Sequence, residues 1–122
     1  MQAEDVVVLY QGSCHCGKIA FEVEGEIDQA MDCNCSHCSR KGYRLWFVPH
    51  TQLTLKTPVG DYATYRFNKH IIEHHFCSKC GCAPFASGRD REGNKMAGIN
   101  LRCIENLDLS TVKTIQVDGR SF

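Results

Sequence analysis

The segment Cys77-Ser78-Lys79-Cys80-Gly81 has the spacing of a metal-binding turn. Two residues between the cysteines let one tight turn present both sulfurs, and the glycine permits a backbone reversal without a Cβ clash. A tighter segment of the same kind, Cys14-His15-Cys16-Gly17, lies far earlier in the chain. Because zinc takes four ligands in a tetrahedron and thiolates suit it, the two halves predict a closed four-sulfur site that pins the first hairpin to the later part of the sheet. Its ligands would be Cys14, Cys16, Cys77 and Cys80.

The predicted four-sulfur site bears directly on folding. Zinc binding at such sites contributes roughly 10–16 kcal/mol. The stability of a whole domain is typically about 5–15 kcal/mol. The metal is therefore expected to decide whether the chain folds. An iron–sulfur cluster, the main alternative, has different usual ligand spacings.

A second cluster, Cys33-Asn34-Cys35-Ser36-His37-Cys38, supplies three sulfurs within one short segment. No fourth ligand with comparable local spacing accompanies it. Three protein ligands plus an exchangeable position are typical of a catalytic zinc, and an incoming thiol could occupy that position as thiolate. Two alternatives stay open: a second closed zinc completed by Cys82, Cys103 or a histidine, and metal-free buried or redox-active thiols. Spacing favours Cys82 and Cys103 as small packed hydrophobes rather than ligands.

The nine cysteines favour metal binding over disulfides. An odd number excludes complete internal pairing, and cysteines separated by one residue seldom reach good disulfide geometry with each other. A reducing compartment, where thiols persist, is the expected setting. The N-terminal residues 1–10 combine two acids with a short apolar run and do not resemble a signal peptide, so we expect a cytoplasmic location.

Charge and length narrow the function classes further. The chain has 122 residues, which fits one domain spanning 1–122. Lys plus Arg equals Asp plus Glu at 14 each, without the basic excess of a nucleic-acid binder. No apolar stretch approaches the roughly 18 residues that a membrane span needs. We therefore expect neither a nucleic-acid nor a membrane partner.

Short apolar runs separated by glycine and proline predict a mainly β domain. Lys18 to Glu24 alternates apolar and polar residues, the pattern of a half-buried strand. Further runs rich in aromatic and β-branched residues predict strands near 6–10, 43–48, 53–55, 62–67, 74–76, 83–85, 96–101 and 114–117. A polar turn is expected through Gly88 and Gly93. Brief helices are expected around 36–41 or 105–107.

For most of the histidines and aromatic residues we expect a role in packing rather than in binding or catalysis. His15 and His37 lie between predicted ligands, where an outward orientation is favoured over a role as hydrogen-bond donor to a ligand or as fourth ligand. We expect His70, His74 and His75 to pack in the core or at an edge. The aromatic residues expected in the core rather than on a binding surface are Tyr43, Trp46, Phe47, Tyr62, Tyr65, Phe67, Phe76 and Phe85.

Five motifs in order give the chain a family resemblance. They are Gly12-Ser13-Cys14-His15-Cys16-Gly17, Cys33-x-Cys35-Ser36-x-Cys38, Tyr65-Arg66-Phe67-Asn68, His75-Phe76-Cys77-x-x-Cys80-Gly81 and Asn100-Leu101-Arg102-Cys103. Over about residues 12–109 the chain resembles the glutathione-dependent formaldehyde-activating family, which includes the domain of centromere protein V. The resemblance implies a β-tent fold of short antiparallel strands organised around zinc, a fold shared with a class of Rab-binding zinc proteins.

The resemblance also implies two zinc ions per chain and an activity. A structural zinc would be held by Cys14, Cys16, Cys77 and Cys80, and a second, catalytic zinc by Cys33, Cys35 and Cys38. The family activity is that of a carbon–sulfur lyase that joins glutathione and formaldehyde as S-hydroxymethylglutathione. Arg102 could bind a substrate carboxylate, although a structural ion pair is favoured. The alternatives are a non-enzymatic zinc-binding interaction module and a thiol redox or metal sensor that uses Cys82 and Cys103.

Overall fold

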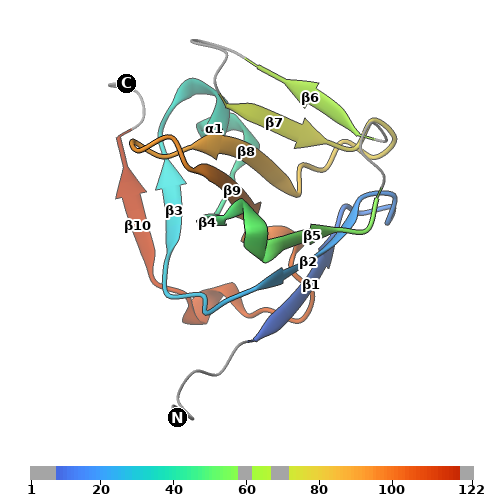
Figure 1. Ribbon diagram of the computed structural model, residues 1–122, viewed down its shortest axis with the longest axis horizontal. Helices are drawn as coiled ribbons and strands as arrows, with labels where there is room; N and C mark the ends of the chain where they lie inside the picture. Colours follow the sequence, from blue (N-terminus) through green and yellow to red (C-terminus); the bar gives the residue numbers. More distant parts are fainter. Residues whose placement is uncertain (1–7, 58–61, 67–71, 119–122) are drawn as a thin grey trace.

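A computed structural model describes residues 8–57, 62–66 and 72–118. Within these residues, strands form a three-stranded sheet in the order β1-β2-β5 and a seven-stranded sheet in the order β10-β3-β4-β9-β8-β7-β6 (Figure 1). The strands are β1 Leu9–Ser13, β2 Ala20–Glu24, β3 Ala30–Cys33, β4 Leu45–Pro49, β5 Leu53–Leu55, β6 Ala63–Tyr65, β7 Glu73–Phe76, β8 Phe85–Arg89, β9 Lys95–Asn100 and β10 Thr114–Val117. The prediction of a mainly β fold is confirmed. The pairs are antiparallel except for β10 with β3, which is parallel.

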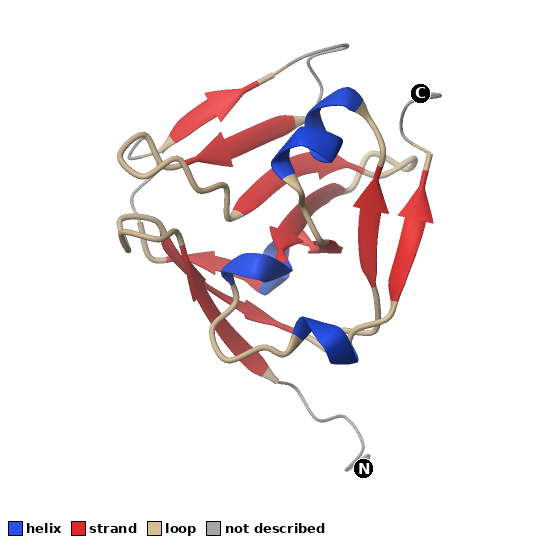
Figure 2. Cartoon of the chain, turned by 180° about the vertical axis from the view of Figure 1, so that it is seen from behind, coloured by secondary structure: helices blue, strands red, loops and turns tan. Residues whose placement is uncertain are grey.

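Helical structure in the described residues is limited to short pieces between strands (Figure 2). They are α1 Ser36–Lys41 and the 3₁₀ turns η1 His50–Gln52, η2 Leu101–Cys103 and η3 Leu109–Thr111. The helix expected at 36–41 is confirmed. None of the described helices is long and apolar enough to cross a membrane.

The small sheet shows why the alternating segment forms a strand. In β2, Phe21 and Val23 are 1% and 0% exposed, while the glutamates between and after them point away from the core. Gly12 of β1 pairs with Phe21, and a Cβ at Gly12 would lie 2.4 Å from the Phe21 ring. Only glycine lets the two strands approach this closely.

One hydrophobic cluster joins the two sheets. It includes Phe21 and Val23 from the small sheet together with Trp46 and Ile99 from the large one. Cys14 and Cys77 belong to the same cluster and are 2% and 0% exposed. The first cysteine-rich site is therefore anchored in the core between the sheets.

Three local predictions were wrong. Strand β3 was not predicted, and its parallel partner β10 lies far away in sequence. Gly88 lies inside β8 opposite Met96 rather than in a turn, because the turn begins at Asp90. No helix forms at 105–107, since Asn106 has φ 61° and the short helical turns lie on either side.

Candidate metal centres

The sulfurs of Cys14, Cys16, Cys77 and Cys80 form one group and lie within 4.8 Å of one another. The Cys14–Cys16 and Cys16–Cys77 sulfur distances are 3.7 and 3.6 Å. A tetrahedral zinc with bonds of about 2.3 Å needs sulfurs about 3.8 Å apart. The residues present therefore fit a closed four-thiolate zinc site.

Backbone amides favour the thiolate state of the Cys77 and Cys80 sulfurs. The N–H groups of Lys79 and Cys80 point at the Cys77 sulfur, with N···S distances of 3.3 and 3.4 Å. The backbone N–H groups of Cys82 and Cys16 lower the pKa of Cys80 to about 5. Gly81 has φ +84°, which allows the turn to close and its N–H to donate to the Cys77 carbonyl at 2.8 Å. Such hydrogen bonds stabilise a charged sulfur.

The sulfurs of Cys33, Cys35 and Cys38 form a second group by the same distance criterion. Cys33 ends β3, Cys35 caps the N-terminus of α1 and Cys38 lies within α1. The Cys35 sulfur accepts the N–H of Cys38 at 3.3 Å. Gly42, with φ 70°, ends the helix. The capping turn thus brings all three sulfurs to one point.

The ionisation of the second group is uneven. Burial, and then the adjacent Cys35 sulfur, raises the pKa of Cys38 above its ordinary value. Burial opposes the ionisation of Cys35, but hydrogen bonds from Cys38 and His37 outweigh it and lower the pKa of that thiol. Because zinc binds thiolates, metal binding here must release protons. The donor set of three closely spaced sulfurs fits a zinc ion with one further ligand position.

No fourth cysteine, histidine or carboxylate joins the second group within the part of the chain that the structure describes. Cys82 packs, partly buried, against the core, and its carbonyl accepts the Cys77 N–H at 2.9 Å. Cys103 is half-buried, and burial, followed by the charge of Cys82, raises its pKa to about 11. Neither cysteine belongs to a metal-ligand group among the described residues.

A small cavity of about 280 Å³ is walled by a set of aromatic and imidazole rings beside the second group. We call it the aromatic pocket; its lining residues are His37, Lys41, Tyr43, Tyr65, His74 and Phe76. Tyr43 and Cys38 lie in one buried cluster, against which Cys33, Cys35 and Phe76 pack. Sequence reasoning missed this pocket, because its residues come from three separate segments.

Two aromatic residues were wrongly assigned to the core. Tyr65 is 48% exposed at the aromatic pocket, and Phe47 is 44% exposed. Phe47 lies on β4 between buried Trp46 and Val48, so the alternation of the strand directs it outward over Gly98. Phe67, also expected in the core, lies outside the described residues.

The predicted outward orientation is found for His15 but not for His37. His15 is exposed, whereas His37 turns inward, with its ring centroid 4.2 Å from that of His74 and 5.3 Å from that of Tyr65. His74 and His75 are buried, as expected. His70 lies outside the described residues.

His75 and Arg102 have structural partners. His75 lies between Thr64 and Ser87, whose hydroxyls are 2.9 and 3.1 Å from its Nδ1 and Nε2 atoms. Arg102 donates from Nε to the Gly42 carbonyl at 2.9 Å. Through that bond Arg102 supports the turn that ends α1.

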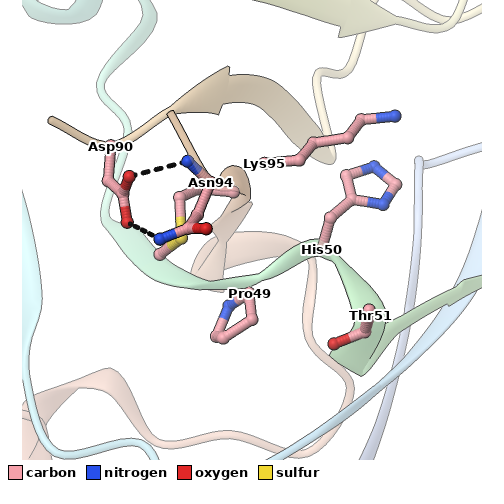
Figure 3. A pocket seen from close by; sticks show the side chains of 7 residues that line it. Pro49, His50, Thr51, Asp90, Asn94 and Lys95 are labelled. Atoms are coloured by element: carbon pink, nitrogen blue, oxygen red, sulfur yellow. Dashed lines mark hydrogen bonds between the residues drawn. The ribbon is translucent and has the colours of Figure 1, made fainter. Parts of the chain in front are cut away.

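A larger cavity of about 580 Å³ lies between η1 and the β8–β9 turn, and no cysteine lines it (Figure 3). Its carboxylate, on Asp90, accepts the backbone N–H groups of Glu92 and Asn94 at 3.0 and 2.8 Å and the Asn94 side chain at 3.2 Å. These bonds hold the turn. The cavity has none of the thiol chemistry of the two sulfur groups.

His74 is expected to make stability depend on pH. Burial, and then the charges of His37, His75 and Lys41, lowers the pKa of His74 to about 4. An unfolded histidine titrates near 6.5, so protons favour the unfolded chain. The contribution is fully present above about pH 6.5 and is lost as pH falls toward 4.

Replacing His74 by phenylalanine removes this proton linkage while keeping a ring of similar size. Between pH 6.5 and 4.5 the free energy of unfolding should fall more steeply with decreasing pH in the wild-type protein than in His74→Phe. The difference between the two slopes should reach up to about 1.4 kcal/mol per pH unit. Denaturant unfolding at each pH measures the slope. Both proteins are compared at the same zinc excess, so that acid-driven metal loss affects them alike. Parallel curves would contradict the assignment.

Comparison with known proteins adds two findings. The family model described as "Glutathione-dependent formaldehyde-activating enzyme" matches residues 9–117 of the chain. The crystal structure of a Rhodobacter sphaeroides protein is similar, with 26% sequence identity and a TM-score of 0.73. The similarity covers 86% of this chain and 99% of that one.

Proposed function

This chain belongs to the glutathione-dependent formaldehyde-activating enzyme family, and from that premise we propose that it is a zinc-dependent carbon–sulfur lyase. Its substrate would be glutathione or a related thiol, which it joins to an aldehyde. With formaldehyde the product is S-hydroxymethylglutathione. The metal-ligand residues proposed are Cys14, Cys16, Cys77 and Cys80 for a structural zinc and Cys33, Cys35 and Cys38 for the reactive one.

The observation that carries the proposal is the contrast between the two sulfur groups. The first supplies four sulfurs, which would saturate a tetrahedral ion, whereas the second supplies three. Cys33 and Cys35 are partly exposed, so a small thiol can approach the second group from solvent. A zinc ion held there would keep an incoming thiol in its reactive thiolate form at neutral pH.

The chain's own residues position the reaction. The Cys38 N–H holds the Cys35 sulfur, and the Arg102–Gly42 bond fixes the end of α1. During synthesis the substrate sulfur forms a bond to the carbonyl carbon, and the carbonyl oxygen takes up a proton in place of the one that the thiol lost. The reverse breaks the carbon–sulfur bond and releases the aldehyde. Thiols add to formaldehyde unaided, so orientation accounts for much of the expected acceleration.

Two groups of cysteines arranged as metal ligands rather than as disulfides fit a reducing compartment, and we propose a cytoplasmic location.

Cobalt substitution tests whether the second group admits a thiol. Cobalt takes the place of zinc and gives cobalt–thiolate absorption bands that respond to a change of ligand. Addition of reduced glutathione should change these bands, because its thiol enters the open position. S-methylglutathione, which lacks a free thiol, is the matched control and should leave the spectrum unaltered. An unaltered spectrum at high glutathione would refute the proposal.

A further inference from the structure

We propose that the aromatic pocket binds the aldehyde half of the substrate, and that this half carries a flat, unsaturated group. The inference rests on the proposed function for the thiol half and for the carbon–sulfur bond. It extends that function by naming a substrate class, aromatic or conjugated aldehydes, in addition to formaldehyde.

The aromatic pocket adjoins the second sulfur group through shared packing. Tyr43 is packed in the same buried cluster as Cys38, with Phe76 against it. His37, in α1, lies between Cys35 and Cys38 in sequence and lines the pocket. A substrate sulfur held beside Cys33, Cys35 and Cys38 would therefore place the substituent of the carbonyl carbon next to the surface that these residues form.

The pocket walls are flat. The rings of His37 and Tyr65 lie 5.3 Å apart at 21°, and those of Tyr43 and His74 lie 6.2 Å apart at 12°. These separations are too short for another ring to enter between the members of a pair, so a planar unsaturated group would contact the edges and outer faces of the rings that line the cavity. Glutathione has no aromatic ring, so it offers a smaller flat surface to these rings than a ring-bearing aldehyde does.

The size of the pocket also exceeds what formaldehyde needs. The cavity is about 280 Å³, whereas a water molecule accounts for about 30 Å³ of the liquid. Formaldehyde has only two heavy atoms and fills a minor part of this space. Sites for whole drug-sized ligands measure about 300–1,000 Å³. The pocket thus has room for a ring-sized fragment, well beyond the needs of formaldehyde.

Tyr43 supplies a polar group for the aldehyde oxygen. Its side chain is 3% exposed, and its hydroxyl has no hydrogen-bond partner among the described residues. A buried hydroxyl without a partner is costly, and a ligand oxygen would remove that cost. A phenol keeps its proton at neutral pH and can donate to the carbonyl oxygen. As the sulfur–carbon bond forms, the carbonyl π electrons move to that oxygen, which then takes a proton from water as the thiol proton is released.

Lys41 adds a positive charge at the mouth of the pocket. Its Nζ atom lies 5.5 Å from the centroid of the Phe76 ring. Lys41 is exposed, so its ammonium group can pair with an acidic substituent of the aldehyde or of the thiol without the cost of burying a charge.

Binding of a ring that cannot react tests the pocket separately from the chemistry. The zinc-loaded protein is titrated with benzyl alcohol and followed through its amide ¹H–¹⁵N resonances. Shifts should concentrate at residues 36–43 and 72–76, and methanol over the same range should not produce them. Tyr65→Leu removes an exposed ring from the pocket and should weaken binding about 3- to 10-fold. Phe47→Leu removes a similarly exposed ring elsewhere and should leave the affinity unchanged.

The hydroxyl of Tyr43 is tested by Tyr43→Phe, which keeps the ring. The variant should form the adduct of glutathione and benzaldehyde at least about 10-fold more slowly above the uncatalysed background, as measured by NMR exchange. Loss of a buried hydroxyl without a partner should not unfold the protein. An unchanged rate would remove Tyr43 from the mechanism that we propose.

The outcomes separate the two proposals. The aromatic-pocket proposal would be overturned if benzyl alcohol shifted no amide resonances, or if Tyr65→Leu and Phe47→Leu changed its affinity equally. In that case a response of the cobalt bands to glutathione would still support the lyase. If benzyl alcohol binds at the pocket but glutathione leaves the cobalt bands unchanged, the lyase proposal is overturned and the pocket remains a binding site.

Discussion

Replacing Cys77 by serine should prevent the chain from folding. Cys77 is 0% exposed within the core between the two sheets, and its sulfur lies 3.6 Å from that of Cys16. A hydroxyl is a poor zinc ligand, so the substitution removes one corner of the four-sulfur site. The zinc contribution of roughly 10–16 kcal/mol matches or exceeds a typical domain stability of about 5–15 kcal/mol. Circular dichroism and amide NMR dispersion should both show an unfolded chain.

Cys82→Ser provides a matched control for this prediction. The residue lies next to the same turn and is partly buried, but it does not belong to the four-sulfur group. The variant should remain folded and keep its full metal content. A folded Cys77→Ser protein with native stability would show that the metal does not hold the two sheets together.

Cys35→Ser should abolish the reactive centre and leave the fold intact. Serine is a good N-cap residue, so its hydroxyl can take over the N–H of Cys38 that the Cys35 sulfur accepts at 3.3 Å. The second group then has two sulfurs instead of three. Changes at hydrogen-bond partners of metal ligands already cost about 10- to 100-fold in metal affinity or activity. Loss of a ligand itself should cost more than about 100-fold.

The measurements are metal content, unfolding and the rate of adduct exchange. Bound zinc should fall from two ions per chain to one, and thermal unfolding should stay close to that of the parent protein. Cys103→Ser makes the same chemical change outside both sulfur groups and should retain both ions. A Cys35→Ser protein that keeps two ions and full activity would rule out the second group as the reactive centre.

The local geometry of the cysteine turns was predictable from the spacing of the cysteines in the sequence. Cys77-x-x-Cys80-Gly81 forms the tight turn expected of it, with Gly81 at φ +84°. Cys35 and Cys38 come together through one helix cap. These geometries depend on residues a few positions apart, so the sequence encodes them directly.

The strand pattern was predictable where one face of a strand is buried and the other is exposed. The segment that contains β2 shows this, since Phe21 and Val23 alternate with glutamates. Strand β3 lacks such a pattern, because Ala30 is buried and the residues after it are all half-buried. Its strand conformation depends on pairing with β10, which lies at the far end of the chain.

By itself the sequence determined the two half-sites of the first sulfur group, the three cysteines of the second and that the fold is mainly β, because ligand spacing and strand alternation are local properties. The first group also depends on the tertiary structure, because Cys16 and Cys77, whose sulfurs lie 3.6 Å apart, are far apart in sequence. Only the tertiary structure decided which aromatic residues leave the core. Tyr65 on β6, His74 on β7 and His37 on α1 meet in one pocket because strand pairing and the helix cap bring their segments together. The identity of an aromatic residue does not show whether its ring faces the core or a cavity, because the residues that surround the ring come from distant parts of the chain.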